Sequence, residues 1–293
     1  MIVWKDNSVT VFRSSLYMTN SIVVQTDDLV LVVDPTWLPH EIASIRAYTD
    51  SIRGGRPLYL LFTHSDYDHI LGWGAFRDAA TIASAPFAAK RPEAKEAIVE
   101  TVRAFDDEYY IERGYDVAYP DVDIVIGEEG ESFVVGGTRL VFYGAQGHND
   151  DGLLTAVEPL GLLVAGDYLS DVEFPYIYVS SAQYEETVGK LDRLLDDHRI
   201  RLLLPGHGSP TDDRSEMKRR QTDSLAYIAS MRERIRSGDR DGIDRLIDGC
   251  SFPRNMRKFH DNNRRLMEQE CRANQASAAG RDPEPNSGER GEL

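Results

Sequence analysis

Short runs of alternating apolar and polar residues open the chain. They cover residues 8–12, 16–25 and 29–33, and polar pairs at 20–21 and 27–28 break the pattern. Alternation with a period of two is typical of strands that bury one face, and the polar breaks are typical of turns. The first 35 residues therefore predict a β-meander.

Helices and short apolar strands follow. Residues 40–52 have helical spacing, which a glycine pair ends. The run 58–62 is short, apolar and partly aromatic, as in a buried strand, and residues 70–74 indicate a helical turn. Residues 81–85 then predict a strand, and residues 87–102 a helix.

A second group of strands comes next. Glycine-bearing turns separate strand-like runs at 122–126, 131–135 and 138–144. Runs at 153–157 and 162–165 have the pattern of a hairpin. A helix at 184–197 and a strand at 201–204 are expected beyond it, and the strands of this part are expected to form a sheet sandwich.

Two histidines and two carboxylates lie within six residues just after the strand at 58–62. His64, Asp66 and Asp68 share the strand's period of two, and His69 follows at the bend. A strand end is rigid, and the turn beyond it allows side chains to converge. This stretch therefore predicts metal ligation by imidazole nitrogen and carboxylate oxygen. The ordinary alternative is a polar loop with two unrelated histidines.

Three more metal-competent residues favour a metal site over a polar loop. His148 lies in a glycine-bearing turn, and Asp167 and His207 lie in such turns directly after apolar runs. Turns on a rigid scaffold commonly carry functional side chains. We therefore expect one cluster of seven metal ligands: His64, Asp66, Asp68, His69, His148, Asp167 and His207.

The order and spacing of these residues resemble those of the metallo-β-lactamase-fold superfamily of metal-dependent hydrolases and oxidoreductases. The resemblance covers about the first 210 residues. The first motif of that family is His-x-His-x-Asp-His, and the corresponding segment here is His64-Ser65-Asp66-Tyr67-Asp68-His69. The later single histidine, the bridging aspartate and the last histidine of the family correspond to His148, Asp167 and His207.

This resemblance implies an α+β fold, a four-layer αββα sandwich, and two divalent metal ions. Asp167 would bridge the two ions. The other ligands of one ion would be His64, Asp66 and His148, and those of the other Asp68, His69 and His207.

Asp66 departs from the family motif, which has a second histidine at this position. A carboxylate is a harder ligand than imidazole and shifts the preference from zinc towards iron or manganese. Flavodiiron oxidoreductases carry Glu there, but they need an attached flavodoxin domain, and nothing after residue 210 resembles one. We expect zinc, with iron or manganese as alternatives. A single tightly held ion is expected if Asp66 weakens the first site.

The resemblance implies hydrolysis by a metal-bridged hydroxide. Its target would be an ester, lactone, thioester, amide or phosphodiester of a small organic substrate. Asp68 is expected to be catalytic, orienting the nucleophile or accepting its proton. Asp34 either supports the metal site from behind, as in the family, or only forms a turn. The alternatives are an iron-dependent oxidoreductase of the same fold and a protein that has lost turnover.

Two aromatic-rich stretches are candidates for the substrate pocket. Residues 105–121 are acidic and rich in tyrosine, as in a lid over the metals, although an ordinary connection would look the same. The second stretch, residues 168–180, follows Asp167. Its candidate substrate contacts are Tyr168, Phe174 and Tyr176, for which packing under the loop is the alternative.

The net charge of the chain limits the classes of partner that we expect it to bind. The chain has 293 residues, with 33 basic and 49 acidic side chains and a formal charge of −16. This balance disfavours nucleic acid and anionic membranes, because both would be repelled. No signal segment or membrane span is apparent, and Cys250 and Cys271 are expected to be free thiols, or a surface disulfide as the alternative. We expect a cytoplasmic protein with a small-molecule substrate.

The composition changes after residue 211. Amphipathic, arginine-rich helices are expected at 216–236, 242–247 and 255–271, with His260 exposed. They would pack over the active-site mouth or mediate self-association as a homodimer. Residues 273–293 have the composition of a disordered tail. The expected divisions are therefore a catalytic domain at 1–211, a helical extension at 212–272 and a tail at 273–293.

Overall fold

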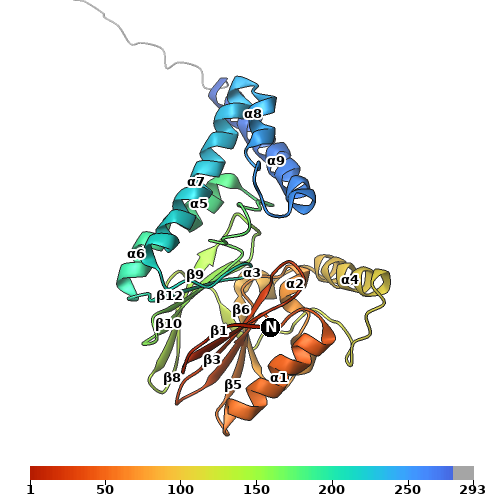
Figure 1. The fold of residues 1–293 in the computed structure, drawn as a ribbon, viewed down its shortest axis with the longest axis vertical. Coiled ribbons are helices and arrows are strands. Elements are labelled where there is room, and N and C mark those ends of the chain that lie inside the picture. Colours follow the sequence, from red (N-terminus) through yellow and green to blue (C-terminus); the bar gives the residue numbers. More distant parts are fainter. Residues whose placement is uncertain (280–293) are drawn as a thin grey trace, which may run out of the picture.

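The computed structural model describes residues 1–279, and the ribbon in Figure 1 shows their arrangement. Within these residues, seven strands form one sheet in the order β1 to β7. Strands β1 to β4 pair antiparallel, as the predicted meander requires, and β4 to β7 are parallel. The strands are β1 (Ile2–Lys5), β2 (Val9–Arg13), β3 (Asn20–Gln25), β4 (Val30–Val33), β5 (Leu58–Leu61), β6 (Ala80–Ser84) and β7 (Ile124–Ile126).

The second sheet contains five strands of the described chain in the order β12-β11-β10-β9-β8. Strands β8 to β11 pair antiparallel, and β12 runs parallel to β11. As a result, β9, β11 and β12 all end at the same edge. The strands are β8 (Ser132–Val135), β9 (Thr138–Ala145), β10 (Gly152–Glu158), β11 (Leu162–Gly166) and β12 (Leu202–Pro205).

Helices cover the outer face of each sheet. On the side of the first sheet lie α1 and α4, and on the side of the second lie α5, α6 and α7 (Figure 1). The helices are α1 (Pro39–Arg53), α2 (Tyr67–Ile70), α3 (Ala85–Ala88), α4 (Pro92–Glu108), α5 (Ser181–Gly189), α6 (Leu191–Asp197), α7 (Arg214–Ser237), α8 (Arg240–Arg245) and α9 (Pro253–Ala279), with a 3₁₀ turn η1 (Trp73–Phe76).

Three apolar cores separate four layers in the described part of the chain. Leu31 and Phe142 meet in the core between the two sheets. Val32, on the other face of β4, packs with Ile45 of α1 in the second core, and the third core joins the second sheet to helices such as α6 through Leu194. Both faces of β4 are thus buried, which explains its uninterrupted apolar run. This arrangement confirms the predicted α+β αββα sandwich.

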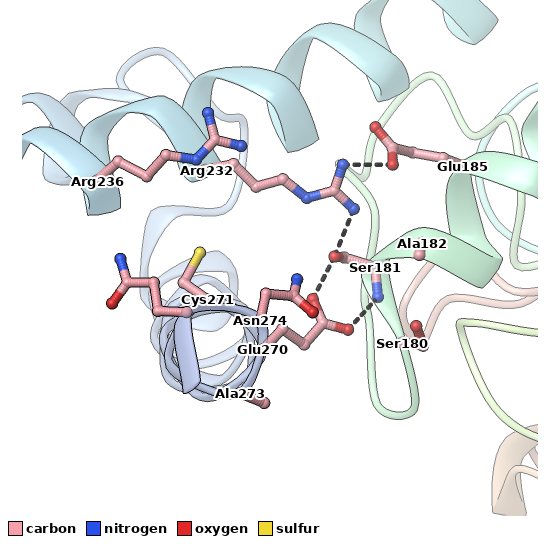
Figure 2. A pocket seen from close by; sticks show the side chains of 11 residues that line it. Ser180, Ser181, Ala182, Glu185, Arg232, Arg236, Glu270, Cys271, Ala273 and Asn274 are labelled. Carbon is pink, nitrogen blue, oxygen red and sulfur yellow. Dashed lines mark hydrogen bonds and ion pairs between the residues drawn. The ribbon is translucent and has the colours of Figure 1, made fainter. Parts of the chain in front are cut away.

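The C-terminal helices dock on the second sheet's side through polar contacts as well as apolar ones. In Figure 2, the Glu270 carboxylate of α9 accepts hydrogen bonds from the backbone N–H and the hydroxyl of Ser181, and the N–H bond measures 2.9 Å. Arg232 of α7 donates to the same hydroxyl over 2.7 Å and pairs with Glu185. Helices α7 and α9 are therefore both held to the start of α5.

Three expectations about individual segments were wrong. The helix predicted at 87–102 is interrupted, because Pro92 starts a new helix, α4, after the short α3. Seven residues of the tail predicted at 273–293 belong to α9, and the rest of that tail, 280–293, lies outside the described residues. His260 is fully buried, because its face of α9 packs on α7, where its Nδ1 lies 2.9 Å from the Tyr227 hydroxyl.

Two further observations bear on the predicted environment of the protein. Cys250 and Cys271 are free thiols. Among the helices of residues 1–279, none combines the length and the apolarity that crossing a membrane requires.

Candidate metal centre

The seven predicted ligands lie together at one edge of the sandwich. His148, Asp167 and His207 follow the carboxyl ends of β9, β11 and β12. The segment 64–69 follows the end of β5, on the other sheet. The strand itself ends at Leu61, and Asp66 is the N-cap of α2. The side chains of this segment are therefore brought together by the turn into α2, and not by the alternation along a strand that the sequence predicted.

One group of candidate ligands surrounds one oxygen of Asp167. Nε2 of His148 lies 3.2 Å from Asp66 Oδ2 and 3.3 Å from Asp167 Oδ2. Nε2 of His64 lies 3.7 Å from each of these two oxygens. One ligand atom from each of these four residues lies within 4.8 Å of all the others, so a single ion could be surrounded.

A second group surrounds the other oxygen of Asp167. Nε2 of His69 and Nε2 of His207 lie 3.1 Å and 3.3 Å from Asp167 Oδ1. The same two nitrogens lie 3.6 Å and 3.4 Å from Asp68 Oδ2. The two oxygens of Asp167 thus face different groups, which is the geometry of a bridging carboxylate.

Hydrogen bonds behind the cluster orient the imidazoles. Carbonyl oxygens can only accept, so Nδ1–H of His148 donates to Tyr176 O over 2.7 Å, and Nδ1–H of His207 donates to Tyr17 O over 2.9 Å. In both rings Nε2 therefore faces the cluster and is the atom that would bind a metal ion. Such second partners fix the ring orientation of metal-binding histidines.

Asp34 plays the same part for the other two histidines. Its Oδ2 accepts from His69 Nδ1 over 2.9 Å and from the Thr63 hydroxyl over 2.5 Å. Because Thr63 donates to Asp34, its oxygen is left to accept from His64 Nδ1, 3.0 Å away. Asp34 is buried and supports both rings, so the structure favours the supporting role over a simple turn.

The donor set fits divalent metal ions. The Nε2 atoms of His64 and His69 and Oδ1 of Asp167 are buried and have no hydrogen-bond partner in the described chain. Buried polar atoms are normally paired, since leaving them unpaired is costly. Four imidazoles and three carboxylates match the ligand types of zinc and, with the harder Asp66, of iron or manganese.

In the protein without metal, burial and neighbouring charges shift the pKa values of the cluster residues in different directions. Burial opposes the charge on His207, but the carboxylates of Asp167 and Glu173 outweigh it and raise its pKa to about 10. Burial would raise the pKa of Asp167, but the surrounding imidazoles hold it well below its usual range. At His64, by contrast, burial and the nearby His69 lower the pKa to about 3.

A cavity of about 280 Å³ opens over the cluster. Asp66, Asp68, Asp167 and His207 line its floor, and Glu173 lies beside them, largely buried. Burial, with the nearby charges of Asp167 and Asp68, raises the pKa of the Glu173 carboxyl to about 7. Bound cations would act in the opposite direction on that pKa. The other residues that line the cavity are Tyr17, Tyr67, Tyr176, Tyr178, Asn255, Lys258, Phe259 and Asn262.

Of the three predicted substrate contacts, Tyr176 lines this cavity and the other two lie elsewhere. The Tyr168 hydroxyl is buried behind the cluster, where it accepts from His148 N and lies 2.8 Å from Gln146 O. Phe174 stacks on Tyr227 of α7, with ring centroids 4.8 Å apart. Tyr168 and Phe174 therefore fit the alternative of packing under the loop.

The stretch 105–121 packs as a connection. Phe105 belongs to α4 and lies against Trp37, with ring centroids 4.6 Å apart. Tyr115 donates to Leu71 O over 2.8 Å. Of the described residues that line the cavity, none comes from this stretch. The wall that a lid would form is supplied by α9, which carries no motif that marks it as part of a site.

Comparisons with known proteins agree with this geometry. The family model of the metallo-beta-lactamase superfamily matches residues 15–218. The chain therefore belongs to the metallo-beta-lactamase superfamily, a class whose members are typically metal-dependent hydrolases. A comparison with curated proteins gives no match.

Solved structures show the same fold. A metallo-beta-lactamase family protein from Thermus thermophilus is 20% identical, with a TM-score of 0.65 over 92% of this chain and 94% of that one. The stereoselective inverting sec-alkylsulfatase Pisa1 from a Pseudomonas species is 16% identical, with a TM-score of 0.64 over 96% of this chain but 52% of its own. A superfamily protein from Sulfolobus tokodaii is 19% identical, with a TM-score of 0.51 over 75% and 87%.

Proposed function

We propose that the protein is a metal-dependent hydrolase of a small organic substrate. The bond cleaved would be that of an ester, lactone, thioester, amide or phosphodiester. One observation carries the proposal. Six side chains, from turns that follow strands of both sheets, meet around the two oxygens of Asp167, with the Nε2 atoms of four histidines directed at them. A cavity of about 280 Å³ above them, near the lower end for ligand pockets, suits a small molecule.

The residues of the chain have distinct parts in this reaction. Divalent ions, when bound, make water a better nucleophile and polarise the oxygen of the bond under attack. Asp68 lies on the cavity floor, where it can orient that nucleophile or take its proton. Asp34 and the Tyr176 carbonyl hold the imidazoles in place. Overall, water adds across the bond, so an ester gives an acid and an alcohol.

Metal analysis coupled to a substrate panel tests the proposal. The protein is expressed in medium supplemented with zinc, iron or manganese, and bound metal is quantified before each assay. The panel holds esters, lactones, thioesters, amides and phosphodiesters, with a secondary alkyl sulfate added because a protein of the same fold is an alkylsulfatase. We expect two metal equivalents and hydrolysis of at least one class. Full metal occupancy without any hydrolysis would instead favour a protein that has lost turnover.

Asp66 motivates a second candidate, an iron-dependent oxidoreductase. Its Oδ2 lies 3.2 Å from His148 Nε2, so the harder ligand is within the cluster and favours iron. Two irons with a visible charge-transfer band and no hydrolysis would support this candidate.

The variant Asp66→His tests whether Asp66 sets the metal preference. We expect the ratio of zinc to iron affinity to rise about tenfold or more, because imidazole replaces carboxylate in contact with the ion. Competition between the two metals, measured for both proteins, gives the ratio. An unchanged ratio would place Asp66 outside direct contact with the metal.

A further inference from the structure

Helix α9 carries two stripes of residues with different surroundings. One stripe is buried against the rest of the protein and consists of Met256, His260, Asn263 and Met267. The other lines the cavity over the metal cluster and consists of Asn255, Lys258, Phe259 and Asn262. The second set has the spacing i, i+3, i+4, i+7, which is one face of a helix. Because the first stripe is buried against the protein, the second stripe of α9 faces the cavity.

Several contacts hold the cavity-lining face of α9 in place. The Phe259 ring stacks on Tyr176, with centroids 4.0 Å apart and planes at 15°. The Asn263 side chain donates to Pro175 O over 2.5 Å and accepts from Ile177 N over 2.9 Å. Farther along, Glu270 bonds the start of α5 (Figure 2). The cavity face of α9 is thus tied directly to the loop that supports His148.

Aromatic rings surround the upper part of the cavity. Tyr17, Tyr67, Tyr176, Tyr178 and Phe259 all line it. Their rings offer flat apolar surface to a bound molecule, and such surfaces hold the apolar body of a ligand while a few polar groups fix its orientation. This lining fits a substrate with an apolar or flat body.

Among the described residues that line the cavity, Lys258 is the one lysine or arginine. Its Nζ lies 5.5 Å from the centroid of the Phe259 ring, and within residues 1–279 it forms no ion pair. The acidic residues of the lining are Asp66, Asp68 and Asp167, which would be neutralised by metal ions, and Glu173. The ammonium group at the mouth is therefore available to an anionic group of a ligand.

We infer that the substrate is a small organic anion, and that its anionic group pairs with Lys258 while the bond to be cleaved lies on the cavity floor. The inference rests on the proposed hydrolase function and adds the substrate class to it. The apolar body of the substrate lies between the aromatic rings. A flexible lysine at the rim supplies a point charge, so it selects for charge more than for the geometry of the anionic group.

Matched pairs of esters test this substrate class in the metal-loaded, full-length protein. The anionic member is the mono(4-nitrophenyl) ester of succinic, glutaric or adipic acid, and the neutral member is the 4-nitrophenyl ester of the corresponding monocarboxylic acid. At low salt we expect kcat/KM to be about fivefold higher for the best anionic ester, mainly through KM. In Lys258→Met this preference should vanish, because kcat/KM for the anionic esters falls relative to that for the neutral esters. In Lys258→Glu it should reverse.

The control variant is Arg257→Gln, which removes the same charge from the neighbouring position. Arg257 pairs with Asp244 over 3.1 Å and does not line the cavity, so this variant should keep the preference. If Arg257→Gln lost the preference for anionic esters as fully as Lys258→Met, the preference would come from the overall charge, and the inference would be overturned. So would a preference for anionic esters that survives in Lys258→Met, or the absence of any preference in the wild type.

A binding measurement separates this inference from the hydrolase proposal. If none of these esters is hydrolysed, the wider substrate panel still decides the proposed function, and calorimetry with 4-phenylbutyrate and its neutral amide decides the anion site. Tighter binding of the carboxylate that Lys258→Met abolishes supports the site. Carboxylate binding that is equal in Lys258→Met would show that the metal ions hold the anion and would overturn it.

Discussion

Asp167 lies between the two groups of candidate metal ligands. Its two oxygens lie 3.1 to 3.3 Å from Nε2 atoms of three histidines, and each oxygen faces a different group. Gly206 must stay without a side chain beside it, because a Cβ there would lie 2.5 Å from Asp167 Oδ1. The close approach of the β12 turn thus helps to fix the carboxylate between the two groups.

The variant Asp167→Ala should therefore lose both metal ions and all hydrolytic activity. Removing the shared carboxylate takes a ligand from each group and leaves the imidazoles without the charge that holds a cation. Metal content by mass spectrometry of the purified variant gives the answer. Asp196→Ala, which removes an exposed carboxylate on α6, serves as the control and should keep two equivalents. Two equivalents in Asp167→Ala would exclude a bridging role.

The candidate metal ligands could be predicted from the sequence because they lie at recognisable places in the local pattern. His64 and Asp167 each come at the end of an apolar strand, and such strand ends carry functional turns. The meander and the second group of strands were predicted for similar reasons, because burial of one or both faces leaves a local pattern. What was wrong at this scale was the geometry at Asp66, where the chain enters a helix instead of continuing a strand.

Helix α9 is the element whose role the sequence left open, because packing over the active-site mouth and self-association were both expected of it; the structure places it along the cavity. Its helical spacing was visible, but which distant surface a helix covers depends on packing rather than on local pattern. Lys258 and His260 are two positions apart. The first lines the cavity, and the second is buried, although it was expected to be exposed. The tyrosine-rich stretch at 105–121 had the composition of a pocket wall, yet it packs beside α2.

Asn263 of α9 bonds the loop that supports His148. Its amide bonds Pro175 O and Ile177 N, on either side of Tyr176, whose carbonyl accepts from His148 Nδ1. In Asn263→Ala these backbone groups lose their partners, and the support of His148 loosens. We expect the affinity of the ion held by His148 to fall about tenfold, the lower end for loss of a supporting contact.

Titration of zinc against a competing chelator measures this loss. Asn263→Asp keeps the acceptor for Ile177 N but loses the donor to Pro175 O, so its affinity should lie between those of the wild type and the alanine variant. Gln269→Ala, an exposed change on the same helix, is the control. A folded Asn263→Ala protein with wild-type affinity for both ions would show that α9 does not position the site.

The two halves of the molecule meet at the metal cluster. The segment 64–69 follows a strand of the first sheet, and His148, Asp167 and His207 follow strands of the second. Unfolding separates these groups, so metal binding to the native state adds to the free energy of unfolding. The addition is about 2.7 kcal/mol at a free metal concentration a hundred times the dissociation constant.

A chelator should therefore lower the thermal unfolding midpoint of the whole protein. We expect a fall of about 5 °C or more, because that free energy is large relative to the entropy of unfolding of a domain of this size. Differential scanning calorimetry with and without the chelator measures it. Asp167→Ala should unfold at the same temperature in both conditions. A wild-type midpoint that does not respond to the chelator would mean that the cluster holds no ion tightly.

The position of α9 in the chain has a consequence for biosynthesis. The ribosome makes the protein from its N-terminus, so residues 64–207, with all seven candidate ligands, emerge before the helix that walls the cavity. A nascent chain can thus present its cluster through a wider opening than the finished protein has. The order of translation allows a metal ion to enter the cluster before α9 completes the cavity.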